Sequence, residues 1–144
     1  MPPIEDILGQ ALADAFNAVA IDITAQEIQL VRPSRREHGD WTSNAAMQAA
    51  TATGRKPREL AQEISAIIRD APPAHVESVE VAGPGFINFK LHDSWLHEVL
   101  IDAVTSGEEG FARPRLADGN RIQVEFVSAN PTGPIHVGNG WWGS

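Results

Sequence analysis

Several features that mark particular protein classes are missing from this sequence. None of its 144 residues is a cysteine, which excludes disulfides and thiolate metal sites. The five histidines are scattered without a His-x-x-x-His or similar pairing, so no metal site is predicted. No run of about 18 apolar residues occurs, so we expect no membrane span. The acidic N-terminus (MPPIEDILGQ) is not a secretory signal, and a cytoplasmic protein is the default expectation.

Positive charge is scarce. The chain has 11 Lys and Arg against 19 Asp and Glu, a formal net charge of −8, which argues against a nucleic-acid binder. The distribution softens this objection, because short basic clusters on an acidic body can still dock onto a structured nucleic acid. Ordinary solvated surface charge is the alternative interpretation. The two clusters are Arg32, Arg35 and Arg36, and Arg55, Lys56 and Arg58.

Apolar spacing predicts an α+β unit over residues 1–112. The helices are expected over residues 4–20, over residues 42–53, from Pro57 to the Pro72-Pro73 pair, and from Asp93 or Ser94 to Gly107. The second of these helices would be capped by Asp40, Thr42 or Ser43. Strands are expected over residues 24–31, 76–82 and 86–91, with a Gly83-Pro84-Gly85 turn between the last two. Alternation over residues 86–91 predicts that Ile87, Phe89 and Leu91 face the core.

No catalytic motif is evident in residues 1–112. This part has no G-x-S-x-G, no phosphate loop with G-K-[ST] and no evident carboxylate pair. Two stretches stand out, HGDW over residues 38–41 and GPGFIN over residues 83–88. Both also have structural explanations: Gly39 and Asp40 suit a turn and a helix cap, Trp41 suits a core, and Gly85 supplies a positive φ.

A glycine-rich, charged linker over residues 107–120 predicts a domain boundary near residue 112, and therefore a second domain over residues 113–144. An apolar strand over residues 122–127 then runs into NPTGPIHVGN. A strand, a tight turn and a His-x-Gly-polar step suit a nucleotide-phosphate site at the C-terminal end of a parallel strand. His136 could donate a hydrogen bond to a phosphate, Gly138 would let a nucleotide approach the backbone, and Asn139 would share the helical face of His136. A Pro-Gly loop leading into an interface helix is the structural alternative.

Three segments, in family order, resemble arginyl-tRNA synthetase, a class I aminoacyl-tRNA synthetase. They are VEFVSANPTGPIHVGN over residues 124–139, HGDWTSNAAMQAA over residues 38–50 with KPRELA after it, and VAGPGFINF over residues 81–89. The resemblance implies an N-terminal appended tRNA-binding domain, in which helices pack a small antiparallel sheet. The first strand and turn of a Rossmann-type catalytic domain would follow. Asn139 stands where the family usually has its second histidine, and asparagine cannot become cationic.

The resemblance also implies a function, arginine–tRNA ligase, with ATP and Mg²⁺, arginine and tRNA-Arg as partners of a monomeric protein. Residues 1–144 alone should not aminoacylate, because most of the catalytic domain would be missing. The alternative is a free-standing, synthetase-derived module that binds RNA or protein without catalysis. The implied catalytic residues are His136 and Asn139. The implied ATP-binding residues are His136, Gly138 and Asn139, and the arginine-binding residues are Ser128, Asn130 and Glu125. The implied tRNA-binding residues are Arg35, Arg36, His38, Asp40, Phe86 and Asn88.

Overall fold

The structure is a computed structural model that describes residues 2–110, all within the unit Met1–Phe111. The catalytic, ATP-binding and arginine-binding residues expected between 125 and 139 lie outside the described residues, as does the strand expected over 122–127.

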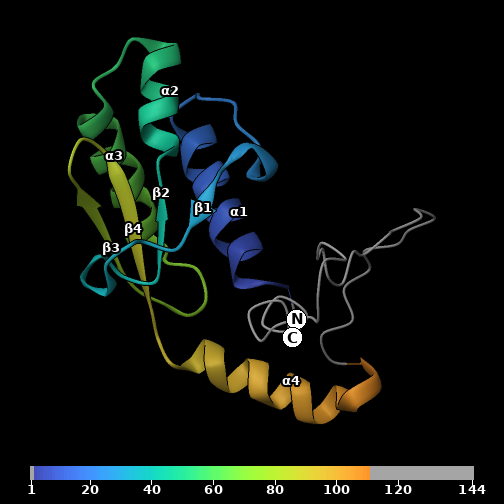
Figure 1. The fold of residues 1–144 in the computed structure, drawn as a ribbon. Helices are drawn as coiled ribbons and strands as arrows, with labels where there is room; N and C mark the ends of the chain where they lie inside the picture. Colours follow the sequence, from blue (N-terminus) through green and yellow to red (C-terminus); the bar gives the residue numbers. More distant parts are fainter. Residues whose placement is uncertain (1, 111–144) are drawn as a thin grey trace, which may run out of the picture. The chain divides into compact units, whose positions relative to one another are not determined.

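Ten short elements make up the described part of the chain (Figure 1). The sheet has four antiparallel strands in the order β1-β2-β4-β3. The α+β architecture expected for the first domain is therefore confirmed. The elements are α1 (Ile4–Ala18), η1 (Ala25–Glu27), β1 (Leu30–Val31), η2 (Arg36–His38), β2 (Trp41–Ser43), α2 (Ala45–Thr53), α3 (Pro57–Asp70), β3 (Val76–Ala82), β4 (Phe86–Leu91) and α4 (Ser94–Gly110).

The β3–β4 hairpin has the bounds expected from its alternating pattern. Ile87, Phe89 and Leu91 are buried as predicted, and Lys90 between them is exposed. The weaker alternation in β3 has a structural cause, since its register with β4 shifts between Val76 and Ser78. An irregularity of this kind changes which face the following residues occupy.

The strand predicted over residues 24–31 is wrong for most of its length. Residues 25–27 form the 3₁₀-helix η1, and only Leu30–Val31 pairs in the sheet. The carboxylate of Glu27 accepts hydrogen bonds from the Thr24 backbone N–H (2.8 Å) and from its hydroxyl (2.7 Å). This local closure competes with extended backbone, and the apolar content of the segment did not reveal it.

The helix predicted to begin near residue 42 begins later, at Ala45. Trp41–Ser43 instead forms β2, which pairs with β4 through Trp41 and Phe89. The N-cap residue is Asn44, so none of the three expected caps occupies that position, although the Ser43 hydroxyl accepts a hydrogen bond from the Ala45 N–H at 3.2 Å. Aromatic and β-branched residues favour strands once a partner strand is available, and that partner lies more than forty residues away.

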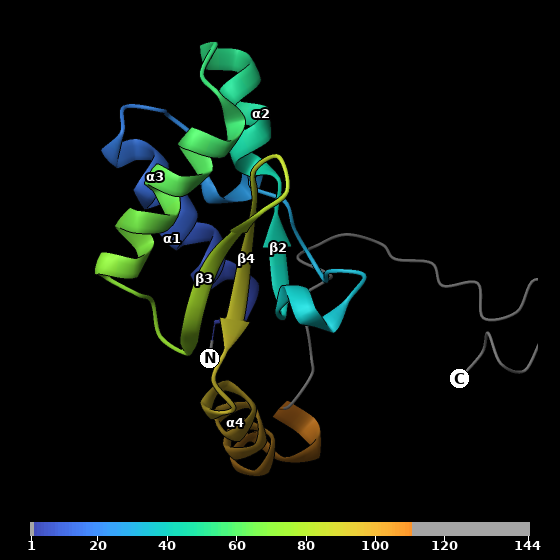
Figure 2. The same cartoon turned by 90° about the vertical axis from the view of Figure 1, so that its left-hand side faces the viewer.

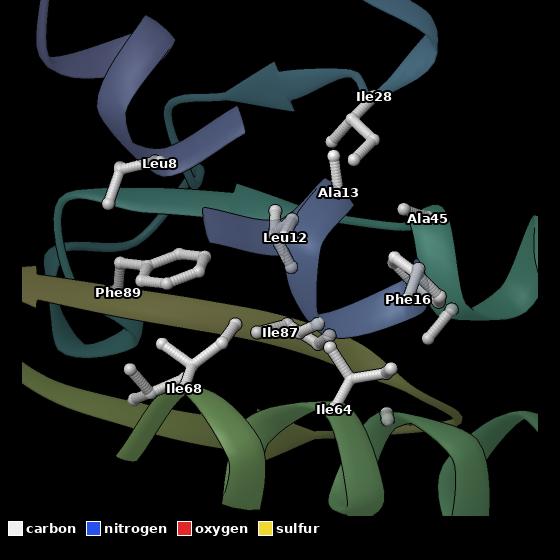
Figure 3. Packing of buried hydrophobic residues seen from close by; sticks show 14 of the residues in the cluster. Leu8, Leu12, Ala13, Phe16, Ile28, Ala45, Ile64, Ile68, Ile87 and Phe89 are labelled. Carbon is white, nitrogen blue, oxygen red and sulfur yellow. The ribbon is translucent and has the colours of Figure 1, made fainter. Parts of the chain in front are cut away.

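The core lies between the sheet and helices α1 and α3, which cover one face of it (Figures 2 and 3). Each fully buried large apolar side chain contributes about 1.5–3 kcal/mol, so the core outweighs exposed ion pairs worth at most about 1 kcal/mol each. Four alanines of α2 extend the core as a small-residue face. The side chains labelled in Figure 3 come from α1, α2, α3, β4 and the segment between η1 and β1: Leu8, Leu12, Ala13, Phe16, Ile28, Ala45, Ile64, Ile68, Ile87 and Phe89.

Helix α4 lies beyond the end of β4, apart from the other helices (Figure 1). Its first turn is tied to the loop before β3. The imidazole of His75 lies 2.9 Å (Nδ1) from the Ser94 hydroxyl and 3.2 Å (Nε2) from the Glu98 carboxylate. The helical backbone breaks at Gly107 (φ 65°, ψ −176°), the position at which the sequence predicts the helix end. Much of its apolar surface is uncovered by the described residues: Leu96, Leu100, Ile101 and Val104.

Candidate nucleic-acid interface

An open cavity of about 790 Å³ lies on the face of the sheet opposite the core, and we call it the loop cavity. One wall is the segment that contains η2, and the other is the outer face of the hairpin. Residues 78, 80, 88 and 90 share that outer face because side chains alternate along a strand. The loop cavity is lined by Arg32, Pro33, Arg36, Glu37, His38, Gly39, Asp40, Ser78, Glu80, Asn88, Phe89 and Lys90.

Asp40 fixes the wall of the loop cavity to β4. Its N–H donates to the Phe89 carbonyl at 2.7 Å, and its carboxylate accepts from the Leu91 N–H at 2.9 Å. Asp40 therefore extends the pairing of β2 with β4 through both its backbone and its side chain. It does not cap α2, so the helix-cap role predicted for Asp40 is wrong.

Gly39 makes this close approach possible. Its backbone has φ 89° and ψ −161°, a combination that is essentially confined to glycine. A Cβ at this position would lie 2.5 Å from the Phe89 carbonyl oxygen. Gly39 therefore serves as more than a turn residue, since any side chain would push the loop away from β4.

The hairpin wall contributes a neutral polar side chain, Asn88, and charged side chains of both signs, Glu80 and Lys90. Asn88 is only 8% exposed and lies opposite Thr42 on β2 and Glu80 on β3. Lys90 lies 3.0 Å from the Glu77 carboxylate, and this hydrogen bond together with the charge of Glu77 raises the pKa of Lys90.

The three arginines of the first basic cluster have different surroundings. Arg35 pairs with Glu37 at 3.3 Å. Arg32 stacks on Trp41, with its Cζ atom 4.1 Å from the ring centroid. Arg36 lines the loop cavity and has no side-chain partner within residues 2–110. A guanidinium that lines an open cavity can bind an anion through up to five donors.

Of the six residues expected to bind tRNA, the structure brings four together around the loop cavity: Arg36, His38, Asp40 and Asn88. Arg35 lies outside the lining, with a side chain that is 74% exposed. Phe86 lies at the other end of β4 and is 38% exposed. It follows Gly85, whose φ is 147° and where an added Cβ would lie 3.0 Å from the Pro57 carbonyl oxygen, so the hairpin turn lies close to the start of α3.

Each cation of the second basic cluster has a partner within the domain, and two of the three partners are carboxylates. Arg55 pairs with Glu63, and Lys56 pairs with Glu59 at 2.7 Å. Arg58 donates to the Gly83 carbonyl at 3.0 Å, which joins α3 to the hairpin turn. These cations are therefore less available to phosphates than Arg36 is.

The sequence interpretation missed the hairpin residues of the loop cavity: Ser78, Glu80 and Lys90. Because side chains alternate along a strand, the sequence could have placed these three residues on the same face of the hairpin. It could not show that residues 36–40 lie next to that face of the hairpin.

Within residues 2–110, no group of three or more His, Cys, Asp or Glu side chains is placed to hold a metal ion. None of the helices in the same range has the length and apolar character needed to cross a membrane.

Residues 3–91 match the family described as "Arginyl tRNA synthetase N terminal domain". The chain belongs to this family. The match includes both walls of the loop cavity and the whole hairpin.

Curated relatives extend the similarity past residue 91. The chain is 46% identical over 142 residues to an arginine–tRNA ligase of Desulforamulus reducens, covering 94% of this chain and 25% of that protein. It is 43% identical over 121 residues to arginine–tRNA ligase 1 of Halalkalibacterium halodurans, covering 84% of this chain and 21% of that protein. The chain thus spans between a fifth and a quarter of the length of these relatives.

A solved structure shares the fold. The arginyl-tRNA synthetase of Thermus thermophilus aligns with a TM-score of 0.59 at 24% identity, over 95% of this chain and 21% of that one.

Proposed function

We propose that this chain is the N-terminal part of an arginine–tRNA ligase, an enzyme that charges tRNA-Arg with arginine using ATP and Mg²⁺. Family membership and the names of relatives at 43% and 46% identity support the proposal. Residues 1–112 would form the appended domain and residues 113–144 the start of the catalytic domain. The whole protein would act as a monomer in the cytoplasm.

In the catalytic part, the proposal gives His136, Gly138 and Asn139 to the ATP phosphates. Ser128 and Asn130, with Glu125, would bind arginine. The test is aminoacylation by the product of the whole gene, assayed with each amino acid. Charging with arginine, and its loss in the His136→Ala variant, is the expected result. Charging with a different amino acid would overturn the assignment.

For the described domain we propose tRNA binding at the loop cavity, around the outer corner of the tRNA near its D-loop. The observation that carries this is the Arg36 guanidinium, which has no partner within residues 2–110 and lies in an open cavity beside His38 and Asn88. A guanidinium can bind a phosphate through two parallel hydrogen bonds. The Asn88 amide offers both a donor and an acceptor to an unstacked base.

The test is the affinity of the 144-residue chain for tRNA-Arg, measured at several salt concentrations. Each phosphate contact contributes about 0.7–0.9 to the slope of log K against log salt. Arg36→Ala should weaken binding and lower this slope by about that amount. Arg35→Ala removes the same charge one residue away from a side chain already paired with Glu37, so it should have a smaller effect. Equal salt slopes for wild type and Arg36→Ala would remove the loop cavity from the phosphate interface.

A further inference from the structure

Arg32 lies between the loop cavity and helix α4. Its Nη1 donates to the Asp40 carbonyl at 3.1 Å. Its Cζ atom lies 4.1 Å from the Trp41 ring centroid and 5.9 Å from that of Trp95 in α4. Arg32 also lines a second cavity of about 220 Å³, shared with Trp95 and His75. One side chain therefore contacts the loop, the sheet and α4.

We propose that Arg32 is a positioning residue for tRNA binding: it holds residues 36–40 in the form that binds RNA by fastening Asp40 to the two tryptophans. This inference rests on the proposed function of the loop cavity. It assigns to Arg32 a task different from that of Arg36, although the sequence places both in one basic cluster.

The hydrogen bonds of Asp40 support this division. Its N–H and its carboxylate are bound to β4, while its carbonyl is bound by Arg32. Of these three hydrogen bonds of Asp40, the bond from Arg32 is the one that does not involve β4. A charged donor makes a stronger hydrogen bond than a neutral one.

The two rings give Arg32 a fixed platform. Trp41 is 7% exposed and belongs to the core. Trp95 lies in the first turn of α4, which the His75 bonds to Ser94 and Glu98 hold in place. A planar guanidinium can stack on an indole ring and donate in its own plane at the same time, which an ammonium group cannot do.

The test uses the 144-residue chain and tRNA-Arg, with Arg32→Met, Arg32→Lys and Arg36→Ala compared with wild type. Methionine keeps most of the stem of the arginine and loses its charge and donors. We expect Arg32→Met to bind roughly three- to tenfold more weakly, with an unchanged salt slope, because it loosens the loop without removing a phosphate contact. Arg32→Lys keeps the charge and should recover only part of the affinity. Arg69→Met is the control, since it removes an exposed arginine whose one side-chain hydrogen bond within residues 2–110 goes to the Ser65 carbonyl of its own helix.

Amide exchange separates this inference from the proposed function. Arg32→Met should speed exchange of the Asp40 N–H, whereas the backbone N–H groups of Glu80 and Asn88, which lie opposite each other in the hairpin, should stay as protected as in wild type. If wild type and Arg36→Ala show no specific binding, the proposed function fails, and Asp40 exchange still decides whether Arg32 holds the loop.

Three results would overturn the inference. Wild-type affinity in Arg32→Met would show that the loop does not need Arg32. A salt slope lowered as in Arg36→Ala would make Arg32 a direct phosphate contact. Unchanged Asp40 exchange would show that Arg32 does not fasten the loop.

Trp95→Leu tests the contact with α4. It should weaken binding about two- to threefold in the wild-type background and have no further effect in Arg32→Met, because both changes act through the same stack. Additive losses in the double variant would refute this part of the inference.

Discussion

Replacing Gly39 by alanine tests how the wall of the loop cavity is built. The backbone there (φ 89°, ψ −161°) is essentially restricted to glycine, and a non-glycine residue in such a conformation costs about 1–3 kcal/mol. The new Cβ would also lie 2.5 Å from the Phe89 carbonyl oxygen and 3.0 Å from its carbon. Both atoms belong to the backbone of the central strand β4, so neither can turn aside as a side chain would.

The loop must therefore move, and the hydrogen bond from the Asp40 N–H to Phe89 is the first to be lost. Such a bond contributes about 0.5–1.5 kcal/mol net. Backbone strain and the lost bond together cost about 1.5–4.5 kcal/mol, and the lower entropy of the unfolded variant offsets about 0.4–1 kcal/mol of this, so we predict a fall of about 1–4 kcal/mol in the free energy of unfolding of Gly39→Ala.

Gly54→Ala is the matched control. Gly54 also has a positive φ (69°), but a Cβ there would meet nothing within 4 Å. Left-handed backbone costs alanine about 1–2 kcal/mol, and the lower entropy of the unfolded variant offsets about 0.4–1 kcal/mol of this. We expect a net loss of about 1 kcal/mol.

Urea unfolding of both variants, followed by circular dichroism, measures the difference. Gly39→Ala should have the lower midpoint by a clear margin and should also bind tRNA-Arg more weakly. Equal stability of the two variants would refute the argument that close contact with β4 fixes the loop.

Three further predictions concern single side chains. Ser65 is fully buried in α3, and its hydroxyl has no hydrogen-bond partner among the described residues. Ser65→Ala should therefore raise the free energy of unfolding by about 1 kcal/mol in the same urea assay. A loss of stability would show that the hydroxyl has a partner. The hydrogen bond from the Thr24 hydroxyl is the main cause that lowers the pKa of Glu27, and the hydrogen bond from the Thr24 backbone N–H lowers it further. These hydrogen bonds stabilise the fold above the ordinary pKa of a glutamate, and the stabilisation is lost as the pH falls through the lowered pKa. Glu27→Gln should therefore weaken the dependence of the free energy of unfolding on pH in the acid range. An unchanged pH dependence would contradict this. Gly85→Ala would place a Cβ 3.0 Å from the Pro57 carbonyl, so it should lower the midpoint of thermal unfolding, whereas an unchanged midpoint would mean that the hairpin turn moves freely from α3.

The hairpin and the long helices could be predicted from sequence because their signals are local. Alternation fixed the buried face of β4, and Pro57 marked the start of α3. Strands β1 and β2 could not be predicted in this way. They have two and three residues, and their pairing depends on β4 rather than on their own pattern.

The loop cavity was predictable only in part. Residues 38–40 and Asn88 belong to the two stretches that stood out in the sequence, Arg36 belongs to the first basic cluster, and the resemblance to arginyl-tRNA synthetase grouped them as tRNA-binding residues. Their meeting depends on the hydrogen bonds that join Asp40 to Phe89 and to Leu91, and Asp40 and Leu91 lie 51 residues apart. The sequence also grouped Arg32 with Arg35 and Arg36, whereas in the structure Arg32 stacks on Trp41 and Arg35 pairs with Glu37.

The central claim is that this domain binds tRNA at the loop cavity, and mapping the contact by nuclear magnetic resonance tests it most directly. Backbone amide signals of the 144-residue chain would be followed while tRNA-Arg is added. The largest changes should fall on residues 36–40 and 88–90, with little change at Arg55, Lys56 and Arg58, whose side chains are paired internally. Changes concentrated at residues 55–58, with the loop cavity unaffected, would contradict the account.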